Sequence, residues 1–374
     1  MVSIDLEKYI TRHSPGYVIE VFNNGIHEEL VFGNSEVVPS IKKTTKDTLY
    51  DIASLTKVFT ASLVYIAFEE GKLDLYTPIT SVEPKFTSLS DVRIIDLLSH
   101  NQNIWTDGYL GSSKSKDDFY RILYTAYVKE RVPTYVDVHY IILGVILEKI
   151  YDKPYDELCC EKIFKKVGMN NTTFNPSPKD TASCNYEHTE NGDIDYITPG
   201  LIHDTKARVA KEFGINLGHA SIFTTGLDLY KFLKTFLDCS LLKESTISLM
   251  LLHRCDNERN FESLNKLYHS NDINLMYKQL LEDKKELPIL YTYNNMSTRY
   301  RNEIDEINDI PKNASDNSIT FSGYTGPMFT IDFDKKIIVV IMCNVIHNSY
   351  LTRKERKQKT TEIMNIIFDK ITNT

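Results

Sequence analysis

The chain has 374 residues, of which 42% are hydrophobic and 25% are charged, a composition typical of a globular protein with a sizeable core. A formal net charge of -8 leaves no basic stripe to neutralise phosphates, which argues against nucleic-acid binding. No stretch approaches the roughly 20 apolar residues of a membrane span, and the N-terminus lacks a signal-peptide core. We therefore expect a cytoplasmic protein without a membrane span.

The cysteines and histidines do not form recognisable ligand sets. Six cysteines lack the paired spacing of a zinc site, and ten histidines are scattered without an HExxH motif. We expect free, mostly buried cysteines and no metal site. The cysteines are Cys159, Cys160, Cys184, Cys239, Cys255 and Cys343.

The N-terminal part of the chain predicts a hairpin. After a possible short helix at residues 5–11, two β-rich runs at residues 17–22 and 26–32 are joined by Asn23-Asn24-Gly25. An Asn-Gly pair between β-rich runs favours a tight turn.

A Ser-x-x-Lys pattern follows the hairpin. A serine and a lysine three residues apart on a helix share one face, so the ammonium can reach the hydroxyl. Only Ser54 opens a long amphipathic segment, which ends at Gly71. An N-cap serine on a core helix remains the alternative explanation. The chain contains the pattern five times, at Ser40/Lys43, Ser54/Lys57, Ser113/Lys116, Ser240/Lys243 and Ser263/Lys266.

The middle of the chain, from about residue 72 to 230, has mainly helical patterns. Helices are predicted at residues 91–100, 138–151 and 228–237 because apolar residues recur there at helical spacing.

Strand patterns return near the C-terminus, at residues 327–333 and 336–345, with a turn at 334–335. An amphipathic helix at 353–371 ends the chain. We interpret its basic residues as a solvated helix face. These are Lys354, Arg356, Lys357 and Lys359.

This order of elements predicts an α+β fold in one domain, residues 1–374. One antiparallel sheet would be built from the N- and C-terminal segments and flanked by helices. We predict a sheet-containing part at residues 1–72 plus about 240–374, and an inserted, mainly helical part at 73–239. Residues 256–316 are polar and stay unassigned to either kind of element.

A Ser/Lys pair needs a further proton-relay group and donors for an oxyanion. Tyr135 and Asp137 precede the helix at residue 138, and Ser322-Gly323-Tyr324-Thr325-Gly326 precedes the strand at 327. Each has an ordinary alternative explanation, since the chain has 23 tyrosines and glycine-rich turns before strands are common.

In this order the motifs resemble those of the serine β-lactamase and penicillin-binding-protein superfamily, especially its class C-related, esterase-like members. That family has Ser-x-x-Lys first, Tyr-x-Asn second, and Lys-Thr-Gly or His-x-Gly on a strand third. The resemblance covers residues from about 15 to 350. Further similar segments lie at residues 96–100, 134–149, 153–155, 167–174 and 218–225.

The resemblance implies a two-step reaction through an acyl-enzyme. Ser54 would be the nucleophile, Lys57 its activating group and Tyr135 the acid/base that protonates the leaving group. The backbone N–H groups of Ser54 and Tyr324 would form the oxyanion hole. The substrate would be a small-molecule or peptide-like acyl compound, and no cofactor is implied.

Two departures from the family pattern concern substrate binding. Phe321 stands where the family has a basic residue that helps to hold a carboxylate, so we predict a substrate that is not carboxylate-anchored. Asp137 replaces the asparagine, and would either strengthen the cationic form of Lys57 or orient a substrate amine or hydroxyl. Ser322 and Gly323 keep the hydroxyl and the glycine of the third motif.

Three functions therefore stay open. The first is an esterase, amidase or acyl transferase that acts on a neutral substrate. The second is a penicillin-binding DD-peptidase or β-lactamase. The third is a catalytically degenerate binding or regulatory protein.

Overall fold

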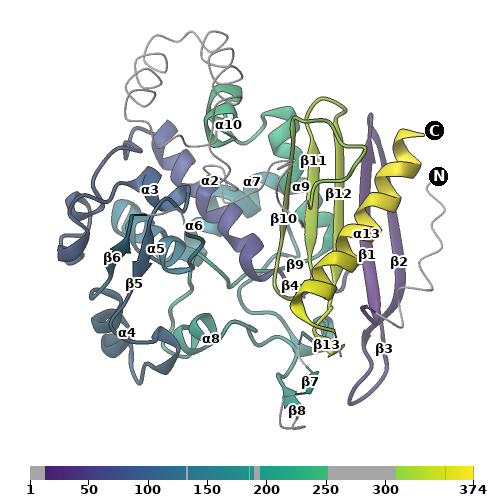
Figure 1. The fold of residues 1–374 in the computed structure, drawn as a ribbon, viewed down its shortest axis with the longest axis horizontal. Helices are drawn as coiled ribbons and strands as arrows, with labels where there is room; N and C mark the ends of the chain where they lie inside the picture. Colours follow the sequence, from purple (N-terminus) through teal and green to yellow (C-terminus); the bar gives the residue numbers. More distant parts are fainter. Residues whose placement is uncertain are drawn as a thin grey trace.

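An antiparallel sheet forms one side of the molecule, and helices form the other (Figure 1). The computed structural model describes residues 13–131, 134–184, 186–188, 194–251, 309–349 and 351–373. The helix predicted at residues 5–11 lies outside these ranges, as do residues 256–308 of the unassigned segment and Cys255.

The sheet combines the two ends of the chain, as predicted. Among the described residues it has six strands in the order β10-β11-β12-β1-β2-β3. These are β1 (Gly16–Asn23), β2 (Ile26–Glu36), β3 (Lys42–Lys43), β10 (Ser318–Ser322), β11 (Met328–Asp332) and β12 (Ile337–Cys343). Strand β1 pairs with β2 and with β12, so the N-terminal hairpin completes a sheet that the C-terminal strands begin.

The hairpin turn has the predicted chemistry. Asn24 and Gly25 have φ angles of 49° and 88°. Positive φ at both central residues is the conformation that a two-residue hairpin turn requires, and asparagine followed by glycine adopts it most readily. The turn thereby sets the register in which Phe22 pairs with His27.

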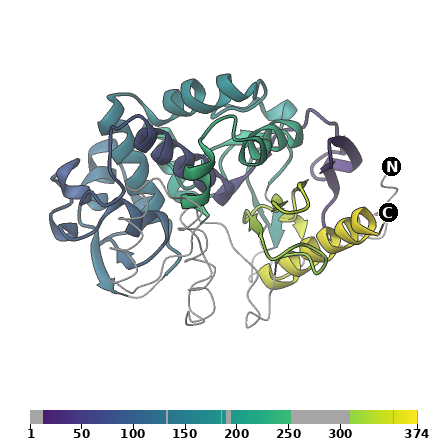
Figure 2. The same ribbon diagram turned by 90° about the horizontal axis from the view of Figure 1, so that it is seen from above.

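The sheet is covered on both faces, because its central strands alternate between two hydrophobic clusters. Tyr17, Ile19 and Val21 of β1 pack with helix α13 (Arg353–Thr372), whereas Val18 packs in the cluster that contains helix α9 (Gly226–Asp238). Figure 2 shows α13 and α9 on opposite sides of the sheet. The α+β fold class is confirmed.

Helix α2 (Thr56–Glu69) begins directly after the turn that contains Ser54 and runs through the centre of the molecule. The prediction of an amphipathic helix is wrong, because every side chain from Thr56 to Ala67 is buried. The hydroxyl groups of Thr56, Thr60 and Ser62 have hydrogen-bond partners inside the core, and Thr60 Oγ1 donates to Gly218 O at 2.6 Å. The helix ends before Gly71, which has the left-handed φ of 68° expected of a helix stop.

The other predicted helices are present with small shifts of their ends. Helix α5 (Val138–Tyr151) has the predicted bounds, α3 (Ile94–Leu98) is shorter, and α9 begins two residues earlier than predicted. Further helices are α4 (Lys116–Leu123), α6 (Tyr155–Cys159), α7 (Lys165–Val167), α8 (Thr205–Glu212) and α10 (Glu244–Met250).

Several strands were missed by the sequence analysis. The most important is β10, which ends at Ser322 and carries Phe321. Further short strands were not predicted, and several of them lie between residues 72 and 230, where mainly helical patterns were expected. These are β4 (Tyr50–Asp51) with β9 (Phe223–Thr224), β5 (Asn103–Trp105) with β6 (Tyr127–Glu130), and β13 (His347–Ser349) with β7 (Tyr186–His188) and β8 (Ile194–Tyr196).

Two whole-chain predictions concern the helices and the cysteines. Within the described ranges, no helix has both the length and the apolar character needed to cross a bilayer. The five cysteines of those ranges are free, and three of them are buried, as predicted. The division into a sheet-containing and a helical part stays a prediction.

Phe59 of α2 provides a test of this core. Its ring stacks on Phe232 of α9 at 4.0 Å between ring centroids, and it is fully buried. Because truncation leaves a cavity, we expect Phe59→Ala to lower the free energy of unfolding by about 3–5 kcal/mol in urea titrations. The control Ile41→Ala, at a side chain that is 74% exposed, should change it by about 0.5 kcal/mol or less. Equal effects of the two substitutions would contradict this packing.

Candidate active site

Ser54 lies in a tight turn that a buried carboxylate holds in place. The turn is a 3-10 segment, Ala53–Leu55, directly before α2, and Ala53 has the unusual φ of 45°. Asp51 Oδ1 accepts a hydrogen bond from Ala53 N at 2.8 Å, and its Oδ2 accepts one from His203 N at 2.8 Å. Burial raises the pKa of Asp51 to about 6, against the effect of these hydrogen bonds. Asp51 thus fixes the backbone that presents the half-buried Ser54.

Lys57 contacts Ser54 as the motif predicts. Its ammonium donates a hydrogen bond from Nζ to Ser54 Oγ at 3.0 Å, and its side chain is fully buried. The other side of the ammonium donates to Asp137 Oδ1 at 2.9 Å. The ring of Tyr135 lies with its centroid 4.7 Å from Nζ. The structure therefore brings together Ser54, Lys57, Tyr135 and Asp137.

These contacts set the protonation of the cluster. Burial lowers the pKa of Lys57, but the charge of Asp137 and the contact with Tyr135 outweigh it, so the pKa lies above the usual lysine value. Burial raises the pKa of Tyr135, and the neighbouring Lys57 offsets this only in part. At neutral pH the pair therefore consists of an ammonium and a phenol. Of the two roles expected for Asp137, this electrostatic effect corresponds to the first, which is to strengthen the cationic form of Lys57.

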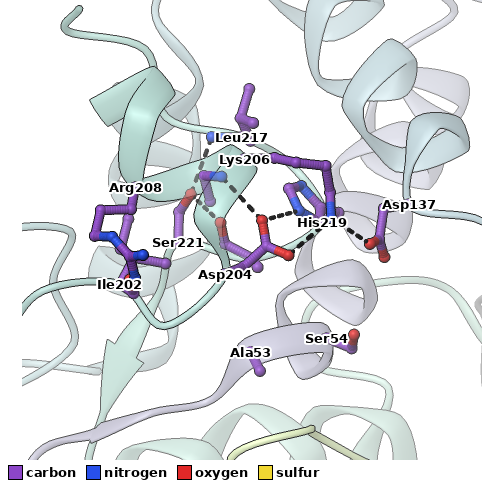
Figure 3. A network of polar contacts seen from close by, with 12 residues as sticks. Ala53, Ser54, Asp137, Ile202, Asp204, Lys206, Arg208, Leu217, His219 and Ser221 are labelled. Atoms are coloured by element: carbon purple, nitrogen blue, oxygen red, sulfur yellow. Dashed lines mark hydrogen bonds and ion pairs between the residues drawn. The ribbon is translucent and has the colours of Figure 1, made fainter. Parts of the chain in front are cut away.

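Asp137 belongs to a longer chain of alternating charges (Figure 3). Lys206 Nζ lies 3.1 Å from Asp137 Oδ2 and 2.9 Å from Asp204 Oδ2, and Asp204 Oδ1 lies 3.0 Å from Nε2 of the buried His219. Burial alone would raise the pKa of Asp204, but His219 and Lys206 lower it. Lys206 is in turn held cationic, because the two carboxylates raise its pKa against the effect of burial.

The same cluster has the residue types of a metal site. Asp137, Asp204 and His219 could each offer one ligand atom, and these atoms lie within 4.8 Å of one another. However, the Lys206 ammonium already lies between the two carboxylates. A cation of the chain itself thus provides the charge compensation that a metal ion would bring.

The turn between β10 and β11 forms the opposite wall. Gly323 N donates to Pro327 O at 2.7 Å, and Thr325 Oγ1 donates to Asp51 O at 2.6 Å, which ties the turn to the Ser54 segment. A Cβ on Gly323 would lie 2.6 Å from the Ile52 carbonyl oxygen, so this close approach requires glycine. Within the described part of the chain, no hydrogen bond uses the backbone N–H of Ser54 or of Tyr324.

A cavity of about 110 Å³ lies between these walls. Ser54 and Tyr135 line it together with four predicted residues of the third motif, Phe321, Ser322, Gly323 and Tyr324. Lys57 and Asp137 lie behind this surface. Phe321 is buried, and its ring centroid is 6.5 Å from that of Tyr135.

The cavity also has residues that the sequence analysis misinterpreted. Arg353, Arg356 and Lys357 of α13 line it, together with Asp309. The prediction that the basic residues of this helix form a solvated face is wrong for Arg356, which is buried, and for Lys357, whose Nζ lies 2.6 Å from the buried Asp309. Helical spacing shows which residues share a face, but it does not show what that face contacts.

Tyr135 is positioned from behind by His100. Thr134 N donates to His100 O at 2.9 Å, and the His100 ring lies 4.5 Å from the Tyr135 ring between centroids. His100 was expected at the end of a predicted helix and within a segment of the family resemblance, without a role in the site. His219 was noted in the same way, whereas Asp204 and Lys206 were missed. Asp204 is the N-cap of α8, and an aspartate in that position could have been noticed in the sequence. No comparable local pattern marks Lys206.

Known proteins of similar sequence show the family of the chain. The family model "Beta-lactamase" matches residues 7–360. An N-acetylmuramyl-L-alanine amidase of Bacillus subtilis is 25% identical over 272 residues, which is 62% of this chain and 61% of the amidase. A putative D-alanyl-D-alanine carboxypeptidase of Salmonella gallinarum is 27% identical over 242 residues, 55% of this chain and 54% of that protein. The chain thus spans less than two thirds of the length of these relatives.

The fold is also shared with solved structures. A mutant of simvastatin synthase from Aspergillus terreus superposes with a TM-score of 0.71 at 15% identity, covering 99% of this chain and 94% of the synthase. At this identity the likeness shows a common fold. Together with the family match over nearly the whole chain, it leads to one conclusion: the chain belongs to the beta-lactamase family.

Proposed function

We propose that the protein is a serine hydrolase or acyl transferase that forms an acyl-enzyme on Ser54. The observation that carries the proposal is the 3.0 Å hydrogen bond from the fully buried Lys57 ammonium to Ser54 Oγ at the edge of a cavity. A serine on a core helix needs no buried cation beside it. A nucleophilic serine needs a neighbouring group that can take up its proton, and Lys57 can do so once its ammonium has lost a proton.

The Lys57 and Tyr135 pair acts as the base after it has lost one proton. The hydroxyl proton of Ser54 moves to this pair while Oγ adds to the acyl carbonyl carbon. The carbonyl oxygen then carries the negative charge and accepts hydrogen bonds from the N–H groups of Ser54 and Tyr324. Collapse expels the leaving group, to which Tyr135 returns the proton, and an ester on Ser54 remains. Water or another acceptor takes up the acyl group in the second step.

The substrate is a small-molecule or peptide-like acyl compound. The similarity to an amidase and to a putative carboxypeptidase supports acyl transfer from an amide, and the small cavity supports a compact reacting group. In this proposal Phe321 provides an apolar contact and packs against Tyr135, while Ser322 and Gly323 shape the wall.

The second candidate is a penicillin-binding peptidase or β-lactamase, which the similarity to a putative D-alanyl-D-alanine carboxypeptidase favours. Mass spectrometry after incubation with benzylpenicillin distinguishes the two. A penicilloyl adduct on Ser54 would favour this second candidate, and ester turnover without an adduct would favour the first.

The proposal is tested by ester hydrolysis. We expect wild-type protein to hydrolyse short-chain para-nitrophenyl esters, and Ser54→Ala to lose at least about 10³-fold in kcat because no nucleophile remains. Ser240→Ala is the matched control, since Ser240 also belongs to a Ser-x-x-Lys pattern but is exposed. It should retain wild-type activity. Equal rates of wild type and Ser54→Ala would refute the proposal, and undetectable activity in both would favour a degenerate binding protein.

The charge chain predicts the pH dependence. Because the pKa of Lys57 and that of Tyr135 are raised, kcat/KM should rise toward alkaline pH. Asp137→Asn removes the negative charge beside Lys57, so the rising limb should move to lower pH by about one unit. Lys206→Met removes the positive charge that faces Asp137, so the limb should move to higher pH. The measurement is the pH profile of ester hydrolysis for the three proteins, and shifts in the same direction would contradict the assignment.

A further inference from the structure

We propose that Lys206 is a positioning residue of the acyl-transfer reaction, which holds Asp137 in place and compensates its charge so that Lys57 can give up a proton. This inference rests on the proposed function and deepens it. Lys206 is not one of the residues that line the cavity, so it acts on Lys57 through Asp137. The assignment also explains how an aspartate can stand at a position where the family pattern has a neutral asparagine.

The first argument is that each oxygen of Asp137 contacts a different ammonium. Oδ1 accepts a hydrogen bond from Lys57 Nζ at 2.9 Å, and Oδ2 lies 3.1 Å from Lys206 Nζ. Burial alone would raise the pKa of Asp137, but Lys57, His219 and Lys206 lower it well below the usual range. Asp137 therefore stays ionised and does not take up the proton of Ser54. Because Lys206 provides a second positive charge, Asp137 holds the proton of Lys57 less firmly than an uncompensated carboxylate would.

The second argument is that Asp204, at the start of helix α8, anchors Lys206. The Lys206 ammonium lies 2.9 Å from Asp204 Oδ2, and Figure 3 shows it between the two carboxylates. The other oxygen of Asp204 is also fixed, because Oδ1 accepts a hydrogen bond from Ala207 N at 2.9 Å and lies 3.0 Å from His219 Nε2. The Lys206 side chain is 18% exposed. Its ammonium is therefore held with the carboxylates and not in solvent.

The third argument is that these contacts return to helix α2, which carries Lys57. Gly218, the neighbour of His219, accepts a hydrogen bond at its carbonyl oxygen from Thr60 Oγ1 of α2 at 2.6 Å. Thr60 lies about one helical turn after Lys57. The chain of polar contacts thus begins and ends on the same helix, so the charge of Lys206 keeps a fixed position relative to Lys57.

The groups around Lys57 determine which titration the experiment detects. Burial lowers the pKa of His100 well below its usual value and that of His139 to about 3, so both stay neutral near pH 7. Burial raises the pKa of Asp51, which interacts with Asp204, to about 6, so Asp51 is mostly ionised above pH 7. Profiles recorded from pH 7 upward therefore detect the Lys57 and Tyr135 pair. The other charged and titratable groups of the cluster are Asp137, Asp204, Lys206 and His219.

The test is a double-mutant cycle on Lys206 and Asp137. Lys206→Met should lower kcat/KM for para-nitrophenyl acetate at pH 7 by about tenfold, because the uncompensated Asp137 moves the rising limb to higher pH by about one unit. In the Asp137→Asn background, the same substitution should change kcat/KM by no more than about threefold, because no carboxylate remains at 137 for Lys206 to compensate. Equal losses in the two backgrounds would overturn the inference.

Control variants separate the effect of charge from an effect on structure. Lys206→Arg keeps the positive charge and should keep the limb at its wild-type position. Lys211→Met changes a lysine of the same helix whose ammonium donates to Asn216 Oδ1 at 2.8 Å, and it should retain wild-type kcat/KM. A limb that moves as far in either control as in Lys206→Met would overturn the assignment. Lys206→Gln takes the place of Lys206→Met if the latter does not fold.

The possible failures are distinguishable. Ser54-dependent hydrolysis with a limb that does not respond to Lys206→Met would overturn this inference and leave the proposed function intact. No hydrolysis by the wild type, or hydrolysis that persists in Ser54→Ala, would overturn the proposed function and the inference with it.

Discussion

The buried ammonium of Lys57 is the constraint on which the rest of the site depends. A cation without solvent is costly unless counter-charges and hydrogen-bond acceptors surround it. Ser54 Oγ and Asp137 Oδ1 accept from it directly, and Lys206 compensates the other oxygen of Asp137. Lys57 is paired with Asp137, and Asp137 is paired with Lys206. Helix α2 can therefore hold a charged lysine in the core of the molecule.

This constraint also explains where the elements meet. The turn before α2 and the start of α5 place Ser54 and Asp137 within reach of the ammonium, and the β10–β11 turn is tied to the Ser54 segment. Asp51 and Gly323 bring the turn against the Ser54 segment, because one carboxylate holds the backbone and one missing Cβ allows the contact. The C-terminal helix then closes the cavity with arginines. Segments that are distant in sequence therefore line the same cavity.

Features with a local physical cause could be predicted from the sequence. The Asn24-Gly25 turn, helix α5 and the Ser54/Lys57 contact depend on neighbouring residues, and all three are present. The roles of Ser54, Lys57 and Tyr135 in catalysis stay predictions. The family resemblance identified Ser54, Tyr135 and the segment at 322–326 as parts of one site, because the three motifs occur in the family's order. No local pattern could join them.

Features that arise from packing between distant segments could not be predicted. Lys206 lies 69 residues after Asp137, and no spacing rule joins them. Strand β10 was missed because it follows the polar segment at 256–316 and because its partner β11 decides its pairing. Helix α2 has polar side chains on several faces, and only the tertiary structure shows that all are buried. Arg356 of α13 was assigned to solvent for the same reason.

The central claim is that Ser54 is the nucleophile of an acyl-enzyme. It is tested most directly by labelling wild-type protein with a fluorophosphonate and mapping the adduct by peptide mass spectrometry. The tryptic peptide of residues 47–57 contains Ser54 as its single serine. We predict one adduct, located on Ser54 and dependent on Lys57. An adduct on a different residue, or undiminished labelling of Ser54→Ala, would contradict the account.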